Sequence, residues 1–174
     1  MKLTKIEAAE QNLRAAIILF FERGHPVPVE TLNSAASGIL RPMAQKRGVE
    51  VFLHDSIMVK DEFRKEWIQV LHEGQNFFKH ADRDEESEFE YNELTTHFLL
   101  VETCHLYRHL ASNEHLKHRQ IKEALAFEIW MGLKYPHLLK EPDALTKIPG
   151  GELLMTFDPD DFGLWRAALG IKRG

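Results

Sequence analysis

Apolar residues near the start of the chain recur at the spacing of one helix face. Thr4 and Glu7 stand at the spacing of a capping box, which marks a helix start. The apolar stripe that follows consists of Ile6, Ala9, Leu13, Ile17, Phe20 and Phe21. This pattern predicts a first helix that ends at Gly24.

A second apolar stripe begins after Pro28, a residue suited to the first turn of a helix. Its members are Leu32, Ala35, Ala36, Ile39, Leu40 and Met43. Because proline lacks the amide donor of the helical pattern, we expect Pro42 to kink or end this helix. A third helix is predicted over residues 60–73, and Gly74 offers a cap or a bend after it.

The fourth predicted helix is apolar around most of its circumference. Asn92 and Thr95 can cap its start, and the pattern continues to about Ala111. Its apolar members include Leu94, Phe98, Leu99, Leu100, Val101, Leu106, Tyr107 and Leu110. A helix of this kind packs centrally among others. A fifth helix is predicted over residues 116–134, before Pro136.

Two segments depart from the helical pattern. Residues 49–53 alternate in polarity, so they form either an extended connection or a strand paired with residues 88–91 in one small β-hairpin. Residues 136–174 are loop-rich and hold one last short helix that ends at Gly170. We therefore expect an all-α fold, an antiparallel bundle of about five helices with a loop-rich C-terminal appendage.

Composition indicates one globular domain. The chain has 174 residues, of which 44% are hydrophobic and 28% charged, so it can bury a core. We expect a single domain over residues 1–174, with the bundle core in residues 1–135. The only cysteine, Cys104, is expected to be a buried, reduced thiol in a cytoplasmic protein. No signal-peptide pattern or run of about 20 apolar residues indicates secretion or membrane insertion.

The formal net charge of −5 disfavours nucleic acid as a partner, because binding a polyanion requires clustered Lys and Arg. One local basic patch leaves nucleic-acid binding as an alternative. It consists of His115, Lys117, His118, Arg119 and Lys122. A charged run of this kind is more often a solvated helix face.

The stretch QNFFKHADRD, residues 75–84, combines groups that can bind a ligand. If it is helical, Asn76 and His80 lie one turn apart and converge on one point. An amide and an imidazole both donate and accept hydrogen bonds, and nearby cations can neutralise an anion. The predicted ligand site is Asn76, Lys79, His80, Asp82 and Arg83. The alternative is that Phe77 and Phe78 anchor a helix end in the core.

The string of Gln75, Asn76, three residues and His80 resembles the Arg-Asn-three residues-His signature of HEPN domains. These are helical bundles that act as ribonucleases or nucleotide-binding modules in toxin–antitoxin and phage-defence systems. Gln75 stands where that family has Arg, so the resemblance implies a non-catalytic relative, with Arg83 as a substitute if cleavage occurs. The string NFFKHAD also resembles a bacterial helical family of about this length, which implies no activity.

Two other groups of residues could hold a divalent transition metal. Glu102, His105 and His109 fall within one arc of the fourth helix, at spacings that can share an ion. The alternative is that these groups hydrogen-bond across the bundle. His54 and Asp55 resemble the paired residues of metal-dependent HD phosphohydrolases, although Asp55 can also cap a turn.

These patterns favour a non-catalytic binding or interaction module without a cofactor. Its partner would be a small ligand or a protein, with a homodimer among the alternatives, and not a membrane. Two other functions stay open. One is a HEPN-like ribonuclease or nucleotide-binding toxin-type protein that uses His80, and the other is a metal-dependent hydrolase that uses Glu102, His105 and His109.

Overall fold

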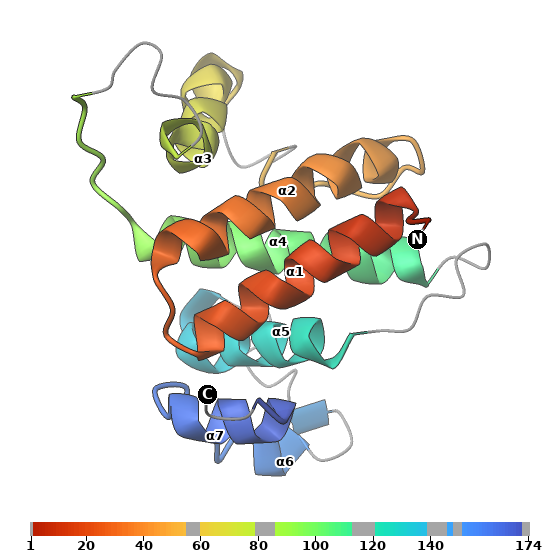
Figure 1. Cartoon of the computed structure of the whole chain (residues 1–174), viewed down its shortest axis with the longest axis vertical. Coiled ribbons are helices and arrows are strands. Elements are labelled where there is room, and N and C mark those ends of the chain that lie inside the picture. Colours follow the sequence, from red (N-terminus) through yellow and green to blue (C-terminus); the bar gives the residue numbers. More distant parts are fainter. Residues whose placement is uncertain are drawn as a thin grey trace.

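The computed structural model describes residues 2–54, 60–78, 86–112, 121–138, 146–147 and 151–171 (Figure 1). Within these residues the fold is all-α, as predicted, and no strand is present. The α-helices are α1 (Lys5–Phe21), α2 (Pro26–Gln45), α3 (Arg64–Phe77), α4 (Glu93–Ala111), α5 (Lys122–Lys134), α6 (Gly151–Leu154) and α7 (Phe162–Leu169). Short 3-10 helices lie at Asp61–Phe63 and Pro136–Leu138. None of the described helices has the length and apolar character to cross a bilayer.

Four helices enclose the hydrophobic core. α1 packs against α2 and α5, and α4 packs against the same two helices from the other side. The largest fully buried side chains include Leu13, Phe21, Leu40, Leu100, Tyr107, Phe127 and Trp130. α3 lies outside this group, beside α2 (Figure 1). The predicted antiparallel bundle of about five helices is thus not confirmed, since α3 attaches to one side of four core helices.

Local capping signals were read correctly from the sequence. Thr4 and Glu7 form the predicted capping box at the start of α1. Asn92 caps α4, and Asp161 caps α7 through its side chain. Gly170 ends α7 with a φ of 70°, the left-handed conformation that glycine adopts without steric cost. Cys104 is buried, as expected.

Three other local predictions had two alternatives each, and the structure excludes one alternative of each. Pro42 does not end α2, which runs on to Gln45; the proline lies in the last turns of the helix and is exposed. Gly74 does not cap α3, which continues to Phe77. Residues 49–53 and 88–91 form no strand, so the small β-hairpin is not present.

The C-terminal segment packs on the four-helix core. α7 contacts α1 and α5, and its Trp165 and Leu169 are buried in the same hydrophobic cluster as the core helices. The Trp165 ring stacks on Phe21 with centroids 5.6 Å apart. The Trp130 indole N–H donates to the Pro159 carbonyl at 2.8 Å. These contacts join α7 to the hydrophobic core.

α3 approaches α2 closely at Gly74. A Cβ atom placed on Gly74 would overlap the carboxylate of Glu30, a buried α2 residue. Glu30 cannot move away cheaply, because its Oε2 accepts a hydrogen bond from Thr96 at 2.8 Å. The absence of a side chain at Gly74 therefore sets how closely the two helices pack.

Gly74→Ala should destabilise the protein by about 1–3 kcal/mol, the usual cost of overpacking a tight contact. Gly38→Ala is the matched control, since Gly38 also lies inside a helix but a Cβ there meets nothing within 4 Å. The control should stabilise by about 0.5–1 kcal/mol through helix propensity. Urea unfolding measures both. Equal effects of the two substitutions would contradict the close approach.

Candidate functional site

The carboxylate of Glu102, on α4, is fully buried at 0% exposure. Its Oε1 accepts a hydrogen bond from the backbone N–H of Leu53 at 2.6 Å, and its Oε2 lies 2.8 Å from Nδ1 of His54. A buried carboxylate is costly unless such partners satisfy it. Glu102 thereby joins the segment after α2 to the centre of the bundle.

The turn that carries His54 is also held from α3. The Trp67 indole N–H donates to the Leu53 carbonyl at 2.7 Å. The Arg64 guanidinium donates to the His54 carbonyl at 3.0 Å. The backbone on both sides of the His54 side chain is thus fixed by α3 while α4 holds the ring. Such support from two directions preorganises a side chain.

One ring nitrogen of His54 is left without a partner. An ionised carboxylate only accepts hydrogen bonds, so Nδ1 carries the hydrogen shared with Glu102. The other nitrogen, Nε2, is buried and has no hydrogen-bond partner among the described residues, and the same holds for Nε of Arg41. Buried polar atoms in native proteins are nearly always paired. These two atoms therefore point to a ligand group that would satisfy them.

Both residues line a cavity of about 400 Å³ between α2 and α3. Its described lining consists of Gly38, Arg41, Pro42, Gln45, His54, Arg64, Ile68 and His72. This lining contains two guanidinium groups and no carboxylate. Glu102 stands behind His54, outside the lining. The cavity is therefore suited to an anion.

His72 positions Arg41 across the cavity. Arginine only donates, so the contact of 3.3 Å between Arg41 Nη1 and His72 Nε2 makes that nitrogen an acceptor. His72 Nδ1 then donates to Gln75 Oε1 at 3.3 Å. Burial lowers the pKa of His72, and Arg41 lowers it further. Burial also lowers the pKa of the Arg41 guanidinium, an effect that Glu102 opposes. His72 is thus a neutral ring with both nitrogens engaged.

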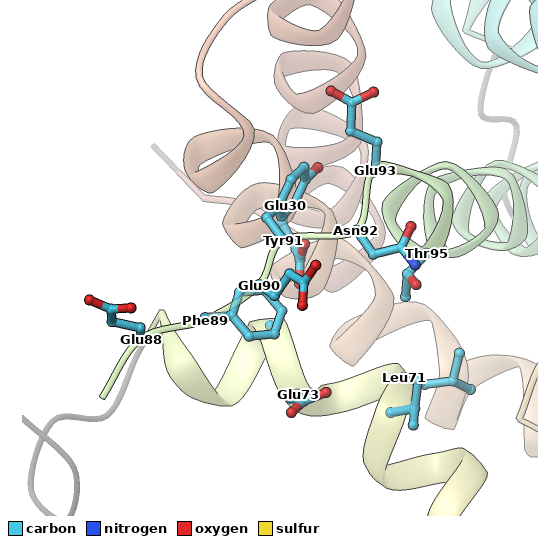
Figure 2. Close-up of a pocket in the computed structure, with 12 residues that line it drawn as sticks. Glu30, Leu71, Glu73, Glu88, Phe89, Glu90, Tyr91, Asn92, Glu93 and Thr95 are labelled. Carbon is cyan, nitrogen blue, oxygen red and sulfur yellow. The ribbon is translucent and has the colours of Figure 1, made fainter. Parts of the chain in front are cut away.

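A second cavity, of about 640 Å³, lies near the other end of α3 (Figure 2). Carboxylates dominate its lining, with Glu73 on α3 and Glu88, Glu90 and Glu93 on the segment that enters α4. These four residues are exposed, whereas Glu30 is buried. The cavity is therefore acidic, in contrast to the one at His54.

Glu30 ends a short chain of hydrogen bonds beside this acidic cavity. Thr96 Oγ1 donates to its Oε2, and Tyr91 OH donates to Thr96 Oγ1 at 2.9 Å. Burial raises the pKa of Glu30, and the Thr96 hydrogen bond partly opposes that shift. The chain holds Tyr91 at the wall of the cavity.

Of the ligand site predicted from the sequence, only Asn76 belongs to the described residues. It is exposed near the end of α3 and lines neither cavity. Lys79, His80, Asp82 and Arg83 lie outside the described residues. Their convergence with Asn76 stays a prediction.

Phe77 and Phe78 have a packing role. The Phe77 ring stacks on Phe89 with centroids 5.3 Å apart, and Phe78 meets Phe89 edge-on at 5.7 Å. All three are half-buried. The two rings thus anchor the end of α3, as the alternative interpretation had it, although on Phe89 and not in the core.

The structure does not bring Glu102, His105 and His109 together as a metal site. The Glu102 carboxylate is engaged by Leu53 and His54, while the His105 ring packs on Phe52 and on His109, with centroids 5.5 Å and 4.3 Å apart. No group of three or more His, Cys, Asp or Glu in the described ranges is arranged to hold a metal ion. Glu102 instead hydrogen-bonds to Leu53 and His54, in agreement with the alternative interpretation of a polar group paired within the fold.

Two further predicted groups fall largely outside the described residues. In the first group, the His54–Asp55 pair, Asp55 lies outside the described residues, so the pair has no described geometry. His54 pairs with Glu102. Of the basic patch only Lys122 is described, and its Nζ donates to the carbonyl of Leu169 on α7. That contact is structural.

Sequence reasoning placed His54 and Glu102 in separate candidate sites and did not find Arg41, Arg64 or His72. One signal could have linked the first two. A glutamate on a helix that is apolar nearly all round must find a buried partner, and a histidine in an extended connection can supply one. No local spacing in the sequence indicates that Arg41, Arg64 and His72 belong to the site.

A scan of protein-family models, a search of curated proteins and a search of solved structures each returned no match to this chain. The geometry of the site is therefore the basis for a functional conclusion.

A third cavity, of about 320 Å³, has His97 and several aromatic rings in its wall. His97 Nδ1 lies 2.9 Å from Tyr135 OH, and its ring meets Phe20 and Trp130 edge-on. Burial, with a smaller effect from Lys134, lowers the pKa of His97 from 6.5 to about 4. The folded protein thus resists protonating this ring.

This shift makes stability depend on pH. The unfolded chain gains the proton near pH 6.5 and the folded chain only near pH 4, so the contribution of His97 is full above 6.5 and is lost as pH falls toward about 4. Between about pH 7.5 and about pH 4.5, the wild type should lose about 2 kcal/mol more than His97→Phe. Denaturant unfolding at both pH values measures this. His137→Gln, which changes an exposed histidine, should behave as wild type.

Proposed function

We propose that this chain binds a small oxyanion in the cavity between α2 and α3. One observation carries the proposal: His54 Nε2 and Arg41 Nε are buried, have no hydrogen-bond partner within the described part of the chain, and belong to residues that line the same cavity. A single oxyanion that bears a hydroxyl or holds a water can satisfy both atoms. It accepts from the guanidinium and donates to the imidazole. The cavity volume of about 400 Å³ lies within the range usual for small-molecule sites.

Electrostatics support an anion over a neutral ligand. Arg41 is partly buried, and the side chain that it contacts, His72, is a neutral ring and not a carboxylate. The carboxylate that acts on the pKa of Arg41 is that of Glu102, which already binds Leu53 and His54. A phosphate or carboxylate in the cavity would supply the charge that a buried guanidinium requires. Guanidinium groups bind these oxyanions in a fixed, two-pronged geometry.

This proposal keeps the expected class of function, a binding module, but moves its site. The ligand site around His80 and the HEPN-like alternatives rest on residues outside the described ranges, so they stay predictions from the sequence. The metal-dependent alternative has no described cluster to support it. The cavity at His54 has both the shape and the unpaired atoms that a ligand site needs.

Inorganic phosphate titrated into the full-length protein should give saturable binding by calorimetry, with His54 ring signals shifted in NMR spectra. Arg41→Gln should weaken that binding about 10- to 100-fold, because it removes a charge-assisted hydrogen bond worth about 1.5–3 kcal/mol. Arg166→Gln on α7, at the opposite end of the molecule from α3, is the matched control and should bind as wild type (Figure 1). Phosphate binding that is unchanged by Arg41→Gln would place the site elsewhere.

A further inference from the structure

We infer that the cavity between α2 and α3 is an active site for the hydrolysis of a small phosphate compound. His54 is the general base that activates the attacking water. The leaving group of the substrate is weakly basic. This inference rests on the proposed function, because the same cavity must first bind the phosphoryl group. It adds a reaction, a catalytic residue and a substrate class to that binding.

The Glu102–His54 pair has the geometry of a catalytic dyad. Glu102 Oε2 holds Nδ1 of His54 at 2.8 Å, so the lone pair of a neutral imidazole is on Nε2. That nitrogen belongs to a ring on the cavity wall and has no partner among the described residues. A carboxylate in this position fixes the tautomer and stabilises the imidazolium that forms when Nε2 takes a proton. Glu102 is thus a positioning residue and His54 the base.

A purely structural role explains only half of this arrangement. Tying the turn after α2 to α4 requires Glu102, the Leu53 N–H and His54 Nδ1. It does not require that His54, with Nε2 unpaired, line a cavity that also contains two guanidinium groups. It also does not require that Trp67 and Arg64 hold the backbone of the same turn from α3. Rigid support of one ring beside anion-binding groups is what base catalysis needs.

The reaction balances with water as the only co-reactant. A water molecule gives a proton to His54 Nε2 while its oxygen forms a bond to phosphorus. The bond between phosphorus and the leaving oxygen breaks, and the leaving group takes that electron pair and departs as an anion. Arg41 offsets the negative charge on the phosphoryl oxygens. The imidazolium then releases its proton to solvent, which regenerates the base.

The leaving group must be weakly basic, because the described lining offers nothing to protonate it. Both nitrogens of His72 are engaged, one by Arg41 and one by Gln75. The arginines do not give up a proton at neutral pH, and Gln45 does not titrate. His54 receives its proton on the side of the attacking water. The substrate class is therefore aryl phosphates, acyl phosphates and phosphoanhydrides, whose leaving groups depart without an acid.

The test is hydrolysis of p-nitrophenyl phosphate by the full-length protein in the presence of a chelator. We expect slow, saturable turnover that inorganic phosphate inhibits competitively. His54→Gln should lower kcat about 100-fold or more while phosphate affinity changes only a few-fold. Glu102→Gln should lower kcat at least about tenfold and change its pH profile, with KM nearly unaltered. His137→Gln is the matched control and should have wild-type kinetics.

The outcomes separate the two proposals. Phosphate binding without turnover would overturn the catalytic assignment and leave the binding site standing, whereas neither binding nor turnover would overturn both. Turnover that survives His54→Gln in a folded protein would also overturn the catalytic assignment. A phosphohistidine trapped by rapid quenching would overturn the role of His54 as a base, since His54 would then be the nucleophile. A normal solvent deuterium isotope effect on kcat of the wild type supports proton transfer to a base, and its absence overturns that step. This measurement needs no variant to fold.

Discussion

The buried carboxylate of Glu102 is the contact on which the site depends. A charge at the centre of a four-helix core is destabilising unless hydrogen-bond donors surround it. Glu102 finds its donors in the segment after α2, at Leu53 and His54, and so draws that segment onto α4. The same contact sets the tautomer of the His54 ring. One interaction therefore supports the connection between helices and also defines the chemistry of the cavity.

α3 attaches to this arrangement from outside the core, through polar groups near its start and through aromatic rings at its end. Trp67 and Arg64 hold the turn that contains His54, and Gly74 lies against Glu30 on α2. A helix docked in this way leaves space beside it that apolar packing would fill. Residues of α3 line two of the cavities.

The two cavities beside α3 differ in the sign of their charge. The one near the start of the helix presents the guanidinium groups of Arg41 and Arg64, and the one near its end presents several glutamates (Figure 2). Charged cavities of opposite sign attract a charged ligand to the one of complementary sign. An anion is attracted to the His54 cavity and repelled by the acidic one.

The sequence by itself determined which segments form the main helices and where several of them begin, because periodicity and caps such as Thr4, Asn92 and Asp161 act within a few residues. It also indicated that α4 would be central. The pairing of His54 with Glu102 was decided only by the tertiary structure. These two residues lie far apart in the chain, and the burial that makes the Glu102 carboxylate require a hydrogen-bond donor arises only when the helices pack.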